Sequence, residues 1–427
     1  MNKNFGWAVG VILIVIMAVF SPRLQAQEIL PLLGNHFGVG ARALGMGGAH
    51  VGVAEDFSAS YWNPAGLGQI HRMEIYGSIS QLTTTHKARF LQNSHTTADE
   101  SNYTNLETGG FVFPVPTYRG SLVFAFGYLR PRSFDHTFSI SGFNYSPGDS
   151  VYQAGEELET GGIGRWTLAG SVQMSENLYL GGSLNYWKGK DDYMWELSEY
   201  DDLDLWTFNA HFLTNRINTK ISGFNLTVAG LYCSKQLRVG ATLSSPITFT
   251  GKEDYQEDET IIYDYEVYNK DSTEVSSAKG YYEYKIQRPY SFSIGASLSL
   301  PLLLIAGDVE LNDWSQIKYK SPNYMVLNNK TLRRIYQSTL RYRLGGEMLL
   351  PFTSIKLRAG YFVDPSPLKN APAAADKKFL TAGVGILLEQ QFNLDIAYIY
   401  GWWRDDTSSY TDKIEVKKIF ISAAYRF

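Results

Sequence analysis

From about residue 72 onward, hydrophobic and polar residues alternate along the chain with a period of two. In residues 290–300, apolar side chains alternate with serine and glycine, and residues 236–250 repeat this pattern. Such alternation over about ten residues, the length that crosses a bilayer as a strand, is typical of a transmembrane β-strand with lipid on one face. A soluble antiparallel sheet with one buried face would alternate in the same way.

The connections between the predicted strands alternate between short turns and long polar loops. The strands are predicted at residues 72–83, 108–116, 121–130, 165–174, 178–189, 221–232, 236–250, 284–300, 303–318, 338–350, 354–363, 378–388, 392–403 and 416–427. The long loops are predicted at about 84–107, 131–164, 190–220, 252–283, 320–337, 364–377 and 405–415. Short turns on one rim and long loops on the other are typical of an outer-membrane barrel. The prediction is an all-β, 14-stranded antiparallel transmembrane barrel, with an additional strand or hairpin in 190–220 left open.

Two further features of the strands fit a bilayer. The last strand alternates up to the terminal Phe427, which resembles the signal read by the outer-membrane barrel-assembly machinery. Aromatic residues such as Trp314, Trp402 and Trp403 lie near predicted strand ends, where the interfaces of a bilayer would fall. Aromatic residues also favour strands in general.

Composition and the N-terminus narrow the class of protein. The formal net charge of −4 gives no basic field for nucleic acid, and a mean hydropathy of −0.19 is too polar for a bundle of membrane helices. Residues 1–26 combine Lys3, an apolar run at 6–20 and a small residue at Ala26, which predicts a cleaved signal peptide. The lone Cys233 allows no internal disulfide, so an exported chain needs another source of stability, such as a closed strand ladder.

The segment 27–71, which precedes the predicted barrel at 72–427, does not alternate. It is rich in glycine at 38–49 and continues through a second motif at 55–67. No Gly-Lys-Ser/Thr follows, which argues against a phosphate-binding loop. The motif residues singled out in this segment are Gly45, Gly47, Gly48, Asp56, Ser58, Asn63, Pro64, Ala65 and Gly66.

This opening resembles that of the FadL-type outer-membrane transporters of hydrophobic compounds. The resemblance implies a barrel with 27–71 folded into its lumen as a hatch. It also implies transport of hydrophobic small molecules, such as long-chain fatty acids or hydrocarbons, in the outer membrane of a Gram-negative-type bacterium, with outer-membrane lipid around the barrel. Residues 40–49 also resemble the barrel subunits of type IX secretion, which shuttle secreted proteins, so that a secretion role stays open as the alternative.

Charged residues fall at positions predicted to face the lumen. They are Arg238, Asp308, Glu310, Arg341, Arg343, Glu347, Lys356, Arg358, Asp395 and Arg426. An arginine among them could bind a substrate carboxylate. The favoured interpretation is an ion-pair network that ties the wall to the hatch, because mixed charges in a closed lumen must be paired.

No other chemistry stands out. The acidic loop 252–283 could bind Ca²⁺ or polysaccharide, but it lacks the spacing of an EF-hand, and a solvated loop face is favoured. The seven histidines are scattered and no Gly-x-Ser-x-Gly elbow occurs, so we expect no enzyme, no cofactor and no metal site. A porin is the third class considered, and a hatch within the lumen argues against an open pore.

Overall fold

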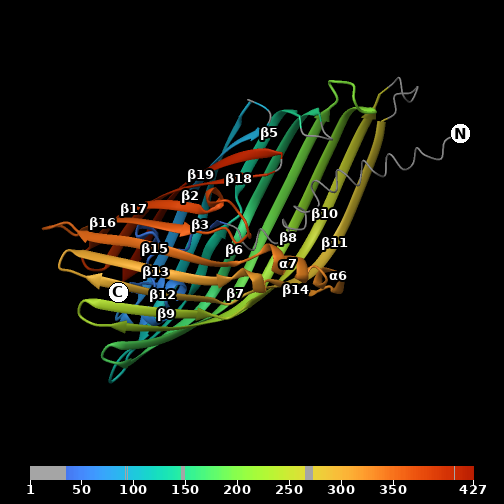
Figure 1. Ribbon diagram of the computed structural model, residues 1–427. Coiled ribbons are helices and arrows are strands. Elements are labelled where there is room, and N and C mark those ends of the chain that lie inside the picture. The colour runs from blue at the N-terminus through green and yellow to red at the C-terminus, as the bar shows by residue number, and fades with distance from the viewer. Residues whose placement is uncertain (1–34, 92, 94, 146–149, 265–272, 408) are drawn as a thin grey trace. The chain divides into compact units, whose positions relative to one another are not determined.

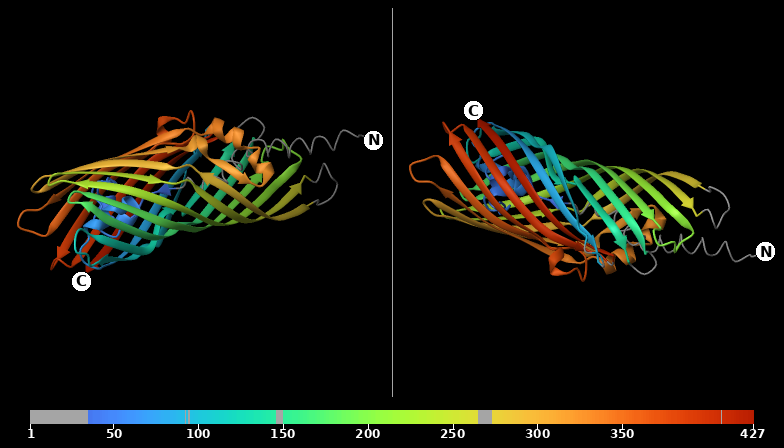
Figure 2. Two further views of the ribbon diagram at one scale, coloured as in Figure 1. Left: turned by 90° about the horizontal axis from the view of Figure 1, so that it is seen from below. Right: turned by 90° about the horizontal axis from the view of Figure 1, so that it is seen from above.

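The computed structural model describes residues 35–427 except 92, 94, 146–149, 265–272 and 408. The predicted signal peptide at 1–26 lies outside the described residues. Within the unit Phe37–Phe427, the strands form one antiparallel sheet that closes on itself, because β19 (Tyr410–Arg426) pairs with β2 (Glu74–Phe90) from Arg426↔Glu74 to Tyr410↔Phe90 (Figures 1 and 2).

The barrel has 14 strand positions, as the alternation predicts. Its first seven positions hold β2, β3 (Thr97–Val115), β4 with β5 (Leu122–Ser133, His136–Asn144), β6 (Val151–Ser175), β7 (Leu178–Tyr200), β8 (Phe208–Cys233) and β9 with β10 (Leu237–Ser244, Ile247–Tyr263). The next seven hold β11 with β12 (Thr273–Arg288, Ser291–Ser299), β13 with β14 (Leu303–Asp313, Lys318–Ser321), β15 (Ser338–Leu349), β16 (Ile355–Asp364), β17 (Lys377–Leu388), β18 (Phe392–Asp406) and β19. Pro246 and Pro289 fall at two of the strand interruptions, where a residue without an N–H cannot continue the ladder.

Short helical pieces accompany the barrel. The structure also contains β1 (Asn35–His36), α3 (Ala41–Gly45), α4 (Ala59–Trp62), η1 (Pro64–Gln69), η2 (Trp314–Gln316), α6 (Asn323–Val326), α7 (Asn329–Ile335) and η3 (Ala373–Ala375). No helix in the described part of the chain is long and apolar enough to cross a membrane.

Five of the predicted long loops are wrong in large part, because strands continue through them. The strands β6, β7 and β8 have 25, 23 and 26 residues, and their pairing runs without a break from the short turns into 151–164, 190–200 and 208–220. The segment 190–220 therefore adds no separate strand. Both faces of these extensions carry polar side chains, so the hydrogen-bonded ladder continues after the apolar–polar alternation has ended.

Alternate side chains of the strands lie on the two faces of the barrel, as predicted. Ile294 on β12 is 47% exposed, whereas the neighbouring Ser293 faces inward and is buried. The same outward apolar row includes Ile79, Leu168, Leu226 and Ile396 on other strands. A closed sheet with exposed apolar residues all around is suited to contact with lipid.

Residues 37–70 are enclosed by the strands of the barrel. In Figures 1 and 2 this segment, in blue, lies inside the barrel toward the end at which the short turns lie, which we call the short-turn end. Nearly all of its side chains are buried. The opposite rim, formed by the strand extensions, is the long-hairpin end.

Candidate functional site

The glycine-rich part of the enclosed segment folds into one tight turn after α3. All five residues of α3 are buried, and Gly47 and Gly48 follow it with φ of 64° and 72°. These backbone conformations are open to glycine at little steric cost. The predicted motif residues Gly47 and Gly48 therefore turn the chain back against the wall.

The second predicted motif shapes the other half of the segment. Asn63 lies at the start of η1, where its Oδ1 accepts a hydrogen bond from the N–H of Ala65 at 3.1 Å. Its Nδ2 donates to the carbonyl of Val51 at 2.7 Å, which joins the two halves of the segment. Asp56 accepts hydrogen bonds from the N–H and hydroxyl of Ser58.

Pro64 and Gly66 complete this motif through backbone constraints. Pro64 occupies the first helical position of η1, where its missing N–H costs nothing. A Cβ on Gly66 would lie 2.1 Å from the carbonyl oxygen of Ala54, so only glycine fits there. The motif is thus explained by local packing, and its role as a hatch stays a prediction.

Glycines in the wall let the main chain of the segment lie directly on the strands. A Cβ at Gly345 would lie 2.1 Å from the carbonyl oxygen of Met46, and one at Gly360 would lie 2.2 Å from the nitrogen of Gly47. A Cβ at Gly383 would lie 3.1 Å from the Cα of the predicted motif residue Gly45. Thr381 fixes this contact through hydrogen bonds that join its hydroxyl to the N–H of Gly47 and the carbonyl of Gly45 at 2.9 and 3.0 Å.

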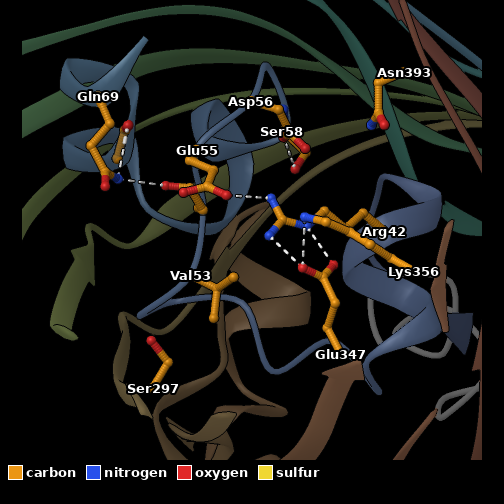
Figure 3. Close-up of polar contacts among 12 residues, drawn as sticks. Arg42, Val53, Glu55, Asp56, Ser58, Gln69, Ser297, Glu347, Lys356 and Asn393 are labelled. Carbon is orange, nitrogen blue, oxygen red and sulfur yellow. Dashed lines mark hydrogen bonds and ion pairs between the residues drawn. The ribbon is translucent and has the colours of Figure 1, made fainter. Parts of the chain in front are cut away.

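Ion pairs add a second kind of contact between segment and wall. Arg42 from the segment binds Glu347 of β15 at 3.0 Å and Glu55 at 2.8 Å (Figure 3). Glu55 in turn binds Arg238 of β9 at 2.8 Å. Burial alone would raise the pKa of Glu55, but the charges of Arg42 and Arg238 lower that pKa to about 2. The carboxylate therefore stays ionised between its two arginines.

Glu347 is the centre of the network on the wall side. Besides Arg42, it binds Arg358 at 2.7 Å and Lys356 at 3.1 Å, and Arg358 continues to Asp395 at 2.6 Å. Three cations thus converge on one buried carboxylate.

Two further lumen carboxylates hold the main chain of the segment. Asp308 accepts the N–H groups of His50 and Val51 at 2.6 and 2.8 Å. Glu74 accepts the N–H of Phe57 at 2.7 Å and binds Arg426 at 2.7 Å. The N–H groups and the arginine that these carboxylates bind could accept a substrate anion only if the segment were released from the wall.

The remaining predicted lumen charges form a group of their own. Glu310 binds Arg343 in close contact and lies 3.7 Å from Arg341, which also binds Asp364. The guanidinium of Arg343 lies 5.4 Å from the ring centroid of Trp62 in the segment. Each predicted lumen arginine is therefore paired with a carboxylate in the wall or the segment.

An apolar inner wall, which the alternation does not predict, follows the segment toward the long-hairpin end. Phe379 stacks on Phe362 with ring centroids 4.3 Å apart and lies 5.9 Å from Phe37 and 6.3 Å from Trp403. Ile399 belongs to the same cluster. The available signal was a loss of alternation, since pairs such as Phe362–Val363 and Phe379–Leu380 are apolar on both faces.

Comparisons with known proteins agree with this architecture. The sequence profile of a family described as outer membrane protein transport protein (OMPP1/FadL/TodX) matches residues 35–426. The chain is similar in structure to the P. putida toluene transporter TodX, with a TM-score of 0.65 and 14% identity over 92% of this chain and 99% of the other. A Pseudomonas aeruginosa FadL homologue gives 0.62 and 14% identity over 92% and 100%. A search of curated protein sequences finds no match.

Proposed function

We propose a transport role for this chain from the premise that it belongs to the outer membrane protein transport protein family (OMPP1/FadL/TodX). Its location is accordingly the outer membrane of a Gram-negative-type bacterium. The cargo class is hydrophobic small molecules, with long-chain fatty acids and hydrocarbons as the compounds to test. The family match does not favour a role in protein secretion, nor does it suggest an enzyme.

The apolar inner wall is almost fully buried in this structure, and it would supply the binding surface for such a compound when the packing around it opens. Phe362, Phe379 and Trp403 lie above the enclosed segment on the side of the long hairpins, which face outward from the cell in such barrels. Each buried CH₂ group contributes about 0.8 kcal/mol. A long acyl chain could therefore bind there through apolar contact, with no dedicated partner for its head group.

The observation that carries the proposal is that the strands enclose residues 37–70 and bury nearly all of their side chains. The segment is held by main-chain contact at Gly345 and Gly360 and by the pairs of Arg42 with Glu347 and Glu55. A bound compound that has to pass the short-turn end must therefore wait until this segment, or the wall beside it, moves. This is the behaviour of a gated carrier and differs from that of an open pore.

Uptake and conductance measurements test the proposal together. Cells that lack their own carriers should take up labelled oleate or toluene when they express the wild-type chain, and the purified barrel should be nearly silent in a planar bilayer. A variant that lacks residues 28–70 should conduct ions and lose regulated uptake. A large constant conductance of the wild-type barrel, or unchanged binding and uptake without the segment, would contradict the gated mechanism.

A further inference from the structure

The long-hairpin end of the barrel holds a cluster of histidine and carboxylate side chains that the transport role does not use. His136 begins β5, which pairs with β6, and Glu157 and Glu159 lie two residues apart on β6 and share its inward face. One ligand atom from each of these three residues lies within 4.8 Å of the others. Within the described residues, this is the one group of three that meets such a criterion.

Both carboxylates contact the imidazole ring directly. The Nε2 of His136 lies 2.9 Å from Glu157 and its Nδ1 lies 3.3 Å from Glu159. The carbonyl of Phe134 lies 2.9 Å from the same Nδ1. Glu157 and Glu159 approach from one strand and contact different ring nitrogens, yet one oxygen of each still lies within 4.8 Å of the other.

A third carboxylate, Asp191 of β7, is buried next to this group. Asp191 is 4% exposed, hydrogen-bonds through its side chain to that of Glu159, and has no partner for its Oδ1 among the described residues. Two carboxylates within hydrogen-bonding distance must share either a proton or a cation.

A second histidine faces the cluster with an unused nitrogen. His86 is 6% exposed and stacks on His136 with ring centroids 5.6 Å apart. Its Nδ1 lies 2.7 Å from Asp412, whereas its Nε2 has no partner in the described part of the chain. A carboxylate that orients one ring nitrogen and leaves the other free is the arrangement found behind metal-binding histidines.

The cluster holds more carboxylates than cationic side chains. Glu157 and Glu159 contact His136, which supplies one positive charge, and Asp191 lies beside Glu159. Among the described residues, no lysine or arginine forms an ion pair with these three carboxylates. Buried anions without a counter-charge are costly. A divalent cation would supply the missing charge and the missing partner of Asp191.

We propose that His136, Glu157, Glu159 and Asp191 bind a divalent transition-metal ion, with Zn²⁺ as the best match. One imidazole nitrogen and several carboxylate oxygens suit Zn²⁺, whereas Ca²⁺ prefers oxygen ligands alone. The ion would tie β5 to β6 and β7 at the rim where compounds enter, with His86 beside it. No sequence motif predicts this site, because its residues lie on three strands at spacings that match no metal motif.

Metal binding to the untagged, full-length protein in detergent tests the proposal. After treatment with a chelator and dialysis, calorimetric titration with ZnCl₂ should give about one ion per chain. Glu157→Gln and Glu159→Gln should each weaken binding at least tenfold. The matched control is Glu199→Gln, because Glu199 and Glu259 flank His211 at 2.8 and 2.9 Å but approach from two different strands and do not converge.

Co²⁺ provides a second readout that does not depend on the variants. The wild-type protein loaded with Co²⁺ should show visible d–d absorption that Zn²⁺ displaces. Variants are compared only after their heat-dependent gel mobility shows a folded barrel. The proposal is overturned if the wild-type protein binds no Zn²⁺ and gives no Co²⁺ spectrum, or if Glu199→Gln reduces binding as much as Glu157→Gln does.

Discussion

Adding one methyl group to the wall at Gly345 should loosen the enclosed segment while the barrel stays intact. A Cβ there would lie 2.1 Å from the carbonyl oxygen of Met46, so this backbone must move by about 1 Å or more to reach ordinary contact. The movement would also strain the hydrogen bonds of Thr381 to Gly45 and Gly47.

The expected cost of Gly345→Ala follows from these contacts. Overpacking of this kind costs about 1–3 kcal/mol, and each weakened hydrogen bond adds about 1 kcal/mol. The local stability of the segment should therefore fall by roughly 2–4 kcal/mol. The strand ladder around Gly345 need not change, since its hydrogen bonds involve main-chain groups of β13 and β16.

The neighbouring glycine is a matched control. Gly346 lies next in the strand on the opposite face, and the nearest atom to a Cβ there is the carbonyl oxygen of Leu304 at 3.6 Å. Gly346→Ala should leave the segment unaffected and be neutral or stabilising by up to about 1 kcal/mol.

Hydrogen exchange followed by mass spectrometry distinguishes the two effects. In Gly345→Ala, peptides that cover residues 40–50 should exchange faster by at least tenfold, whereas barrel peptides should keep their protection. In Gly346→Ala, both should match the wild-type protein. Equal exchange of residues 40–50 in the two variants, or an equal loss of protection in the barrel, would refute the argument that close main-chain contact holds the segment.

Three more predictions concern the charges and the apolar wall. Glu347→Gln removes the carboxylate shared by three cations and should lower the free energy of unfolding by about 3–5 kcal/mol. Glu176→Gln in a short turn should leave it unchanged, and an equal loss in both variants would contradict the network. Burial alone would lower the pKa of His211, but its two carboxylate partners raise that pKa to about 9. His211→Gln should therefore reduce the free energy of unfolding by about 1–2 kcal/mol after screening. This loss should be complete below pH 6.5 and should vanish as the pH rises through 9. A stability difference that is independent of pH would rule this out. Phe379→Ala should weaken oleate or toluene binding at least tenfold, whereas Leu380→Ala on the outer face should not. An unchanged affinity in Phe379→Ala would show that the inner wall does not bind the compound.

The barrel could be predicted from the sequence because lipid and lumen place opposite demands on neighbouring residues. This contrast produces the alternation at 290–300 and the correct number of strands. It disappears where both faces are wet, so the continuations of β6, β7 and β8 were taken for loops although their ladders are unbroken. Backbone hydrogen bonding leaves no such signature in the sequence.

The contacts of the lumen could be predicted only in kind. Mixed charges at inward positions imply pairing, but they do not say that Arg42 pairs with Glu347 or that Asp308 accepts N–H groups of the segment. The cluster that we propose as a metal site could not be predicted for the same reason, because its residues meet only through the register of β5, β6 and β7. Long-range pairing is a property of the closed sheet and not of local spacing.

The contact between segment and wall combines ion pairs with packed apolar side chains, and both bear on whether the segment can move. A seal made of packed apolar side chains would lose about 25 cal/mol for each Å² exposed to water when it opened. The contact at Arg42, Glu55 and Glu347 consists of ion pairs. When these pairs separate, entering water solvates the charges, which offsets much of the pairing energy that is lost. Wall glycines such as Gly360 add close contact without side chains that interlock. Apolar side chains such as Phe37 and Phe57 also pack against the wall, so hydration of the ion pairs lowers only part of the cost of moving the segment. If the segment acts as the proposed gate, we expect its movement to begin at Arg42 and Glu55, where water can replace the lost contacts.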